Sequence, residues 1–319
     1  MSFLKIQRVS KSFSANVNVL EDFSLQISKG EVFSLIGESG SGKSTLLRII
    51  AGKENRDSGE VILGEVRVQN PKEKLVPGYD EIQLVYQDYK LFPNSTVAEN
   101  IARPLLEYDK DYRETRLNQL LKLLNLESMK DKLPRELSGG QQQKVAIGRA
   151  LSLEPSIVLL DEPFSSLDTI QRRELIVELK EIFRELEMTV LFVTHDLDDA
   201  LQMSDHLVII QKGKIIQQGE AEGIFMKPKS MYAAKLFSHL NPVPSNKYHY
   251  IRPSDVELYK SKGLRAKVQE SQYLIHYNQL TVKLSNGDIW KVEDKRRVFK
   301  SGDRVYLKWN PEKEIELKK

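Results

Sequence analysis

The chain has 319 residues and a net charge of +3, and 40% of its residues are hydrophobic and 29% charged, which is typical of a soluble globular protein with room for two domains. It contains no cysteine, which excludes disulfides, thiolate metal sites and cysteine nucleophiles. The N-terminus lacks the apolar core of a signal peptide, and no apolar run approaches the roughly 20 residues that span a bilayer, so we expect any membrane role to need partner subunits.

Residues 2–30 are predicted to form strands and turns, and they include one aromatic residue of interest, Phe13. An aromatic ring ahead of a nucleotide site could stack on a purine base. An isolated phenylalanine is more often part of a core, so its position alone leaves both interpretations open.

Residues 32–51 contain the pattern G-x-x-x-x-G-K-[ST] between a short apolar strand and a helix. The glycines let the backbone turn so that its N–H groups can face phosphate oxygens, and the start of the helix adds a positive dipole end. Lys43 would reach the β- and γ-phosphates, and the Ser44 hydroxyl would ligate Mg²⁺. The residues predicted to bind the nucleotide here are Gly37, Glu38, Ser39, Gly40, Ser41, Gly42, Lys43, Ser44 and Thr45.

The next segments combine strands with a helical insert. Residues 60–68 alternate like a strand, and a second strand over 82–87 ends in Gln87. Helical periodicity follows over 97–106, where Pro104 kinks or ends the helix, and over 113–126. We therefore expect a helical insert over about 88–150 within an α/β core.

A second candidate anion site precedes a helix predicted over 142–151. It consists of Ser138, Gly139, Gly140 and Gln141. A hydroxyl, close backbone approach and a helix dipole together suit a phosphate, although an ordinary helix cap has the same residues. Since one nucleotide needs one phosphate loop, the second site suggests a dimer in which this loop closes on the nucleotide of the other copy.

Two further strands end in chemically active residues. The apolar strand 156–163 carries Asp161 and Glu162 at its carboxyl end, where open α/β sheets place their chemistry. Asp161 is placed to hold Mg²⁺, and Glu162, which points elsewhere, can polarise an attacking water. A helix is predicted over 172–186. His195 follows the strand 189–194; a lone histidine there is more often structural, but beside two phosphate loops we assign it to the γ-phosphate.

The last third begins with a hairpin over 207–219 that turns at Lys212-Gly213, and helical stretches run to about residue 240. Residues 241–247 are a proline-containing linker. Residues 248–319 are all-β, with strands predicted at 274–277, 280–284, 288–292 and 305–309 and a tight turn at Asn286-Gly287. Residues 243–319 hold 17 basic and 10 acidic side chains, which we interpret as a solvated small domain rather than a nucleic-acid or membrane site.

Four motifs together resemble those of the ATP-binding subunits of ABC transporters. They are GESGSGKST at the phosphate loop, LSGGQQQK as the signature, IVLLDEPFSSLD as the Walker B strand and D-loop, and FVTHD as the switch histidine. They occur in the family's order over about residues 3–240, and the signature distinguishes this family from small GTPases, kinases and helicases.

The resemblance implies a head-to-tail dimer that sandwiches two ATP molecules with Mg²⁺. Phe13 would stack on adenine, and Gln87 would touch Mg²⁺ and water and sense the membrane partner. Glu162 would be the catalytic base, and His195 would hold the γ-phosphate. The residues implied to act across the dimer are Ser138, Gly140 and Gln141, at the γ-phosphate of the other copy's ATP, and Asp168, which would link the two sites.

The tail resembles the TOBE (OB-like) domain of importers for sugars, polyamines, ferric iron, sulfate or molybdate, on the strength of Ile251-Arg252-Pro253 and residues 302–307. It has room for one barrel. Within the signature helix, Gln142 and Lys144 stand where arginines are common in the family.

We therefore expect an α/β P-loop NTPase core with a helical insert and an antiparallel β subdomain over 1–240, a linker over 241–247 and a small all-β OB-like domain over 248–319. The expected function is ATP hydrolysis that energises a membrane importer, from the cytoplasmic face, with permease subunits and indirectly a solute-binding protein. An exporter ATPase, or a soluble ABC ATPase acting on ribosomes or nucleic acid, is the alternative, although no nucleic-acid partner is expected. The tail could also serve as a ligand sensor.

Overall fold

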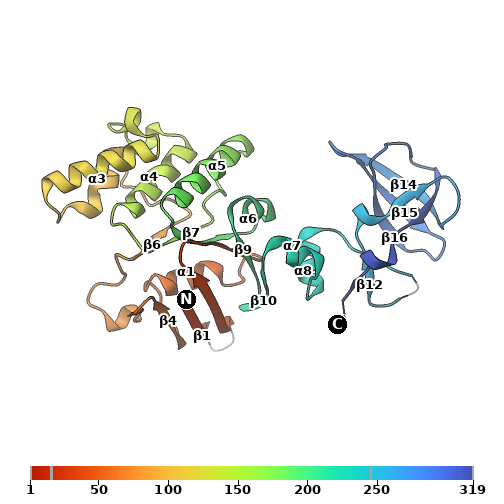
Figure 1. The fold of residues 1–319 in the computed structure, drawn as a ribbon, viewed down its shortest axis with the longest axis horizontal. Coiled ribbons are helices and arrows are strands. Elements are labelled where there is room, and N and C mark those ends of the chain that lie inside the picture. The colour runs from red at the N-terminus through yellow and green to blue at the C-terminus, as the bar shows by residue number, and fades with distance from the viewer. Residues whose placement is uncertain (1, 15–16, 245, 318–319) are drawn as a thin grey trace. The chain divides into compact units, whose positions relative to one another are not determined.

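The computed structural model describes residues 2–14, 17–244 and 246–317. Its contacts divide the chain into two units, Met1–Ala221 and Glu222–Lys319, each described here by itself (Figure 1). This division lies before the linker predicted at 241–247, and the domain limits predicted from the sequence stay a prediction. Among the described residues, no helix combines the length and the apolar composition needed to cross a bilayer.

The first unit is built on a six-stranded sheet with the order β10-β9-β3-β8-β7-β6. Its strands are β3 (Val32–Ile36), β6 (Ile82–Val85), β7 (Ile157–Asp161), β8 (Thr189–Thr194), β9 (His206–Gln211) and β10 (Lys214–Gly219). All neighbours are parallel except β9 and β10, which form the predicted hairpin. Both faces of the sheet are covered, because Val158 and Leu160 of β7 lie in one core cluster and Ile157 and Leu159 in another.

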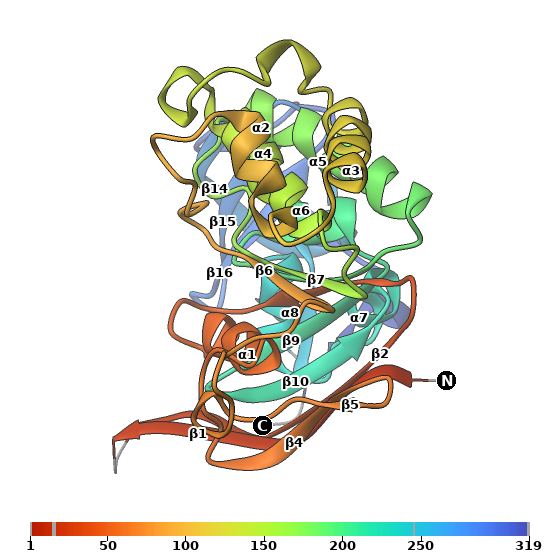
Figure 2. The ribbon, with the colours of Figure 1, turned by 90° about the vertical axis from the view of Figure 1, so that its left-hand side faces the viewer.

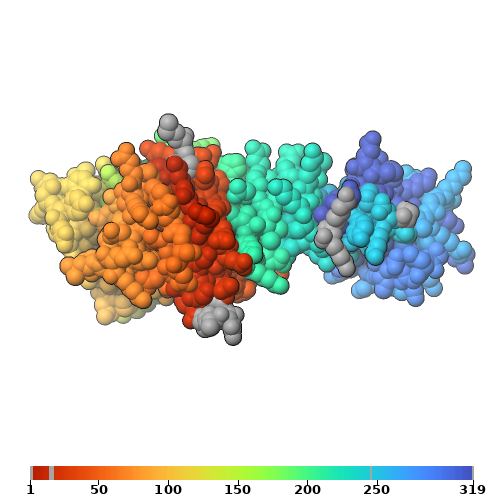
Figure 3. Space-filling model, turned by 90° about the horizontal axis from the view of Figure 1, so that it is seen from below, coloured from red at the N-terminus to blue at the C-terminus, as the bar shows by residue number. Residues whose placement is uncertain are grey.

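One face of this sheet packs against α1 and a four-stranded antiparallel sheet. That sheet has the order β2-β1-β4-β5, with β1 (Ser2–Ser14), β2 (Val17–Ser28), β4 (Ser58–Leu63) and β5 (Val66–Arg67). Helix α1 (Lys43–Ile50) contributes Leu46 and Ile49 to the core between the two sheets. Figure 3 views the antiparallel side from outside, where β1 and β4 (red and orange) cover the same face. The single strand predicted over 60–68 is instead two, because the chain turns at Gly64 with φ +57°.

Helices cover the other face of the central sheet (Figure 2). They are α2 (Val97–Ala102), α3 (Lys110–Leu123), α4 (Gly139–Leu151), α5 (Thr169–Glu185) and α6 (Leu197–Met203). The first three form the predicted helical insert, and α2 gives way to a 3-10 turn at Arg103–Leu105 beside Pro104. Helix α5 begins three residues before the predicted start, because the Asp168 carboxylate accepts hydrogen bonds from the backbone N–H groups of Ile170 and Gln171.

The second unit begins one residue into α7 (Ala221–Met226), includes α8 (Met231–Phe237) and continues as two antiparallel sheets. The smaller has the order β11-β12-β18, and the larger has the order β13-β17-β14-β15-β16. The strands are β11 (Asn241–Pro242), β12 (His249–Ile251), β13 (Glu257–Tyr259), β14 (Leu264–Tyr273), β15 (Asn278–Leu284), β16 (Ile289–Asp294), β17 (Arg304–Lys308) and β18 (Ile315–Glu316). Trp290 is fully buried in the core of this unit.

One turn prediction and one strand prediction in this unit have different outcomes. The turn at Asn286-Gly287 is confirmed: Gly287 has φ +96°, and its N–H donates to the carbonyl of Leu284. The strand predicted over 274–277 is wrong, because Leu274 and Tyr277 exchange backbone hydrogen bonds and form the turn between β14 and β15. Its apolar residues suggested a strand, but a hairpin also needs a connection.

Candidate functional site

The phosphate loop joins β3 to α1 and is shaped by its lysine and its glycines. Lys43 is the first residue of α1, and its ammonium donates to the carbonyls of Gly37 at 2.8 Å and Glu38 at 2.9 Å. Gly42 has φ +100°, and a Cβ there would lie 2.5 Å from the carbonyl oxygen of Val19, so only glycine fits. Burial lowers the pKa of Lys43, against the opposing charges of Glu162 and Asp161. The loop therefore surrounds a buried cation, and its residues 38–40 are exposed.

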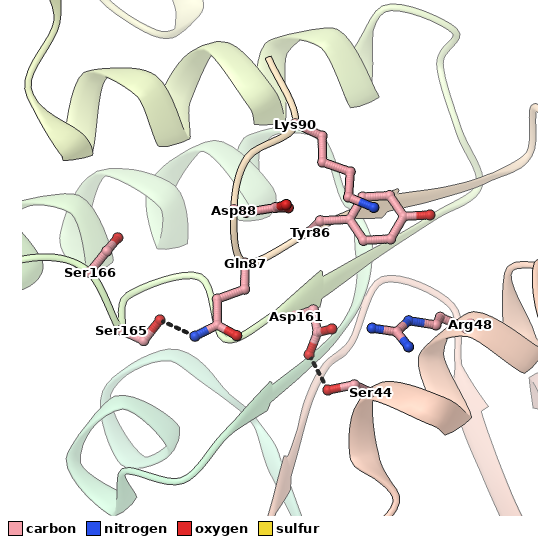
Figure 4. Close-up of a pocket in the computed structure, with 9 residues that line it drawn as sticks. All are labelled: Ser44, Arg48, Tyr86, Gln87, Asp88, Lys90, Asp161, Ser165 and Ser166. Carbon is pink, nitrogen blue, oxygen red and sulfur yellow. Dashed lines mark hydrogen bonds between the residues drawn. The ribbon is translucent and has the colours of Figure 1, made fainter. Parts of the chain in front are cut away.

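A hydrogen bond joins the start of α1 to the end of β7. The Ser44 hydroxyl donates to Oδ1 of Asp161 at 2.7 Å, and both residues line a cavity of about 550 Å³ (Figure 4). Burial raises the pKa of Asp161, although Ser44 and the cation of Arg48 partly oppose that rise. A hydroxyl and a carboxylate side by side are the hard oxygen donors that Mg²⁺ prefers, so the pair fits that ion.

Gln87 lines the same cavity from the loop that follows β6 (Figure 4). Its amide nitrogen donates to the Ser165 hydroxyl at 3.2 Å, so its contact here is with the segment after Glu162. Among the residues with assigned placement, no group of three or more His, Asp or Glu side chains forms a metal cage. A metal ion would thus depend on the Ser44–Asp161 pair, with the Gln87 amide as the adjacent polar group.

The cavity also contains cationic and aromatic side chains that the sequence did not single out. Its lining residues are Ser44, Arg48, Tyr86, Gln87, Asp88, Lys90, Asp161, Ser165 and Ser166. The Lys90 ammonium lies 3.8 Å from the centre of the Tyr86 ring, and burial raises the pKa of the Tyr86 hydroxyl. No motif marks Arg48 or Lys90; the only available signal was the proximity of Lys90 to Gln87 in the chain.

Glu162 and His195 face each other at the carboxyl edge of the sheet. Nδ1 of His195 lies 3.2 Å from Oε2 of Glu162. Glu162 has a left-handed backbone (φ +48°), and its N–H donates to the carbonyl of Val193 on β8. The His195 side chain is 60% exposed and that of Glu162 is 22% exposed, so the imidazole is open to a ligand.

A charged network lies behind the histidine. The Arg172 guanidinium contacts Oδ2 of Asp196 at 2.7 Å and also bonds to the buried carboxylate of Asp199. Thr194 donates to Asp199 at 3.2 Å and accepts from the backbone N–H of Asp196 at 3.0 Å. Burial raises the pKa of Asp199; for Asp196 burial is outweighed by Arg172, which lowers its pKa. These residues flank His195 on both sides in sequence, so the network fixes its backbone.

The predicted second anion site caps α4. The Ser138 hydroxyl accepts from the N–H of Gln141 at 3.4 Å, and the Gln141 side chain accepts from the N–H of Ser138 at 3.0 Å. A Cβ on Gly139 would lie 3.0 Å from Leu167, whereas one on Gly140 would meet nothing within 4 Å. Residues 138–141 are not among the described residues that line the cavity at Ser44. The loop at 138–141 is thus a helix cap outside this cavity, and its anion-binding role stays a prediction.

The remaining predicted residues are placed as follows. The Phe13 side chain is 59% exposed, which excludes a core role, and the Lys11 ammonium lies 4.8 Å from its ring centre. Asp168 caps α5. Sequence reasoning missed Arg149 on α4, whose guanidinium donates to the carbonyls of Lys90 at 2.8 Å and Tyr89 at 3.0 Å. It therefore links the α4 helix to the segment that carries Gln87.

Comparisons with known proteins bear on both units. The ABC transporter family model matches residues 20–165, and the TOBE domain model matches residues 250–315. The chain is 34% identical to the spermidine/putrescine import ATP-binding protein PotA of Thermotoga maritima, covering 97% of this chain and 96% of that protein. It is 32% identical to the sulfate/thiosulfate import ATP-binding protein CysA of Nitrosomonas europaea, covering 98% of this chain and 92% of that protein.

Solved structures resemble about two thirds of the chain. The structure of cbiO1 from Clostridium perfringens, part of the ABC transporter complex cbiONQ, matches with a TM-score of 0.64 and 28% identity over 70% of this chain and 90% of that chain. The dimeric post-hydrolysis structure of the ATP-binding cassette MJ0796, bound to ADP and Pi, matches with a TM-score of 0.60 and 31% identity over 68% of this chain and 98% of that chain.

Proposed function

The chain belongs to the ATP-binding subunits of ABC importers that carry a C-terminal TOBE domain, and from this membership we propose how its residues bind and hydrolyse ATP and what the hydrolysis drives. It is an ATPase that energises the import of a small solute. The predicted importer role and fold are confirmed, and the exporter and ribosomal alternatives are not favoured. The observation that carries the residue-level proposal is the meeting of Ser44 with Asp161, beside Glu162 and His195, at one edge of the sheet.

Lys43 and the phosphate loop bind the phosphates of ATP. The Lys43 ammonium now donates to two loop carbonyls, and we propose that it exchanges them for phosphate oxygens when ATP enters. Ser44 and Asp161 would hold Mg²⁺, with Gln87 nearby, and the ion would supply charge neutralisation at the phosphates. Phe13, exposed and ahead of the loop, stacks on the adenine ring.

Glu162 and His195 act on the γ-phosphate side. Glu162 accepts a hydrogen bond from the attacking water and orients it, and His195 donates to a γ-phosphate oxygen. The 3.2 Å contact between Glu162 and Nδ1 of His195 supports these separate roles, because it leaves Nε2 as the ring nitrogen that can face the phosphate. The Arg172 network holds the histidine's backbone in place.

A second copy of the chain completes each site. Ser138, Gly139, Gly140 and Gln141 form an anion-binding loop away from the cavity at Ser44, so we propose that they close on the γ-phosphate of ATP bound to the partner. Asp168, at the cap of α5, would link the two sites. The structures of the related cassette MJ0796 are dimeric, which supports the pairing of two copies.

Membership among importer subunits suggests the other proteins with which the chain assembles. We propose that the dimer binds integral membrane permease subunits at the cytoplasmic face, that a solute-binding protein delivers the cargo, and that the cargo is a small charged solute. The names of the relatives, which import spermidine/putrescine and sulfate/thiosulfate, support this class. We likewise propose 1–240 as the ATPase domain, 241–247 as a linker and 248–319 as the TOBE-like domain.

The test is affinity purification of the tagged chain from its own membranes, followed by mass spectrometry. A multi-span permease that co-purifies with it, and uptake assays that then identify a charged solute, are the expected results. Ribosomal proteins or nucleic acid in place of a permease would contradict the proposed partners while leaving the ATPase assignment intact.

A further inference from the structure

The large sheet of the second unit places three positive charges directly opposite one another. Lys267 on β14 is in register with Lys283 on β15 and with Arg304 on β17. Arg265 lies two residues before Lys267 on β14, so its side chain is on the same face. We call these four exposed residues, Arg265, Lys267, Lys283 and Arg304, the basic face.

The positive charges of the basic face are not neutralised by carboxylates of the described residues. Among the described residues, no carboxylate forms an ion pair with any of its four side chains. Like charges directly opposite on neighbouring strands are destabilising. The same sheet pairs opposite charges elsewhere, since Glu257 on β13 is in register with Lys308 on β17. The row of like charges is therefore a cost to folding that a bound anion would offset.

The basic face borders a hollow that can hold a ligand. The hollow has a volume of about 860 Å³, within the range of small-molecule sites. Its lining contains all four cations and no acidic or aromatic residue; the other lining residues are Ala266, Val268, Gln269, Leu284, Ser285, Ser301 and Gly302. Cavity, charge and strand register thus coincide at one place in the unit.

We propose that the basic face binds a small multivalent anion that carries phosphate or carboxylate groups. Neighbouring strands lie about 4.8 Å apart, so the row of three cations spans roughly 10 Å and suits a ligand with several anionic groups. The two arginines can each bind such a group with two parallel hydrogen bonds. Single-stranded nucleic acid is disfavoured, because its binding sites combine cations with aromatic stacking platforms and this lining has none.

Calorimetric titration of the full chain with inorganic tripolyphosphate and with citrate tests the proposal. The titration uses a Lys43→Ala background without divalent cations, since the phosphate loop could otherwise bind the probe. We expect one anion per chain, and at least a 10-fold loss of affinity in the Lys267→Gln/Lys283→Gln/Arg304→Gln variant. The matched control, Lys235→Gln/Lys247→Gln/Lys262→Gln, removes the same charge outside the hollow and should keep the affinity.

Three outcomes would overturn the proposal. They are dissociation constants weaker than about 1 mM at physiological salt for both probes, an equal loss of affinity in the two triple variants, and tighter binding of a single-stranded oligonucleotide through the same residues. Misfolding should not mimic a loss of binding, because removing the repulsion is expected to leave the unfolding temperature of the triple variant unchanged or higher at low salt.

Discussion

The hydroxyl of Ser44 donates a 2.7 Å hydrogen bond to Asp161, which joins the first turn of α1 to the end of β7. Burial holds the pKa of Asp161 above its ordinary value, so its ionised form is a cost to the folded protein without a cation. The site therefore holds a desolvated negative charge on Asp161, and the proposed Mg²⁺ would offset the free-energy cost of that charge.

Asp161→Asn should abolish hydrolysis yet stabilise the nucleotide-free protein at neutral pH. A carboxyl group whose folded pKa is raised binds its proton more tightly in the native state, so it costs stability once the pH exceeds the unfolded pKa, and the cost disappears as the pH falls below that value. We expect at least a roughly 100-fold loss of ATPase rate. Thermal unfolding of the two proteins at pH 7.5 and pH 4 measures the difference; a gain that is equal at both pH values would contradict the explanation.

Glu162→Gln should stop turnover while leaving ATP bound. The amide keeps the side chain's size but cannot accept a proton from water, so the ATP-bound dimer should accumulate. Size-exclusion chromatography with ATP and a phosphate-release assay measure the two effects. Glu187→Gln is the matched control, because Glu187 is exposed and has the same left-handed backbone, with φ +47° against +48°. Unchanged phosphate release in Glu162→Gln would remove this residue from the mechanism.

Arg149 should be required for the geometry of the segment that carries Gln87. Tyr89 and Lys90 both have left-handed backbones, with φ +58° and +45°, a conformation that costs about 1–3 kcal/mol per residue. The Arg149 guanidinium binds both of their carbonyls. Arg149→Met should therefore destabilise the protein by about 1–3 kcal/mol and lower ATPase activity.

Two companion variants separate this explanation from a loss of packing. Arg149→Lys should recover only part of the loss, because an ammonium lacks the planar fork that reaches two carbonyls. Lys90→Gly should restore stability to Arg149→Met, because glycine adopts the left-handed conformation freely. Denaturant unfolding gives both values, and no recovery on adding the glycine would count against the strain argument.

The parts of the structure that were predicted correctly depend on residues that are contiguous in the sequence. The phosphate loop and the buried strand ending at Asp161 depend on local backbone geometry, and both are where the motifs placed them. Arg149 and Lys90 were missed because their contact joins residues 59 apart, and no local pattern records it. The strand predicted over 274–277 failed because an apolar run also suits the tip of a hairpin.

Phe13 also shows that local sequence does not record contacts between distant segments. Position alone favoured core packing and the family resemblance favoured stacking, because exposure depends on whether distant segments cover the ring. In the fold the ring is 59% exposed at the end of β1, so only the packing alternative is excluded. Its role at adenine stays a prediction.

Arg172 should act through His195, as a positioning residue. Its removal leaves the buried carboxylate of Asp199 without a cation, so Arg172→Met should destabilise the protein by about 2–3 kcal/mol; this is below the range for fully buried pairs, because the Arg172 side chain is 26% exposed. Burial raises the pKa of Asp199, and loss of Arg172 should raise it further. The variant should therefore lose more stability at alkaline pH, where Asp199 is ionised, than at acidic pH, where it takes up a proton.

A double variant and a kinetic measurement complete this test. Arg172→Met/Asp199→Asn should regain most of the lost stability, because the unpaired charge is gone, and the extra pH dependence seen in Arg172→Met should disappear. If the network's purpose is to hold His195, the ATPase rate of the double variant should stay low, since Thr194 has lost the Asp199 carboxylate and Asp196 has lost Arg172. Steady-state kinetics should show the loss mainly in kcat, because the phosphate loop that binds ATP is untouched. A double variant with full kcat would show that the network supports folding alone.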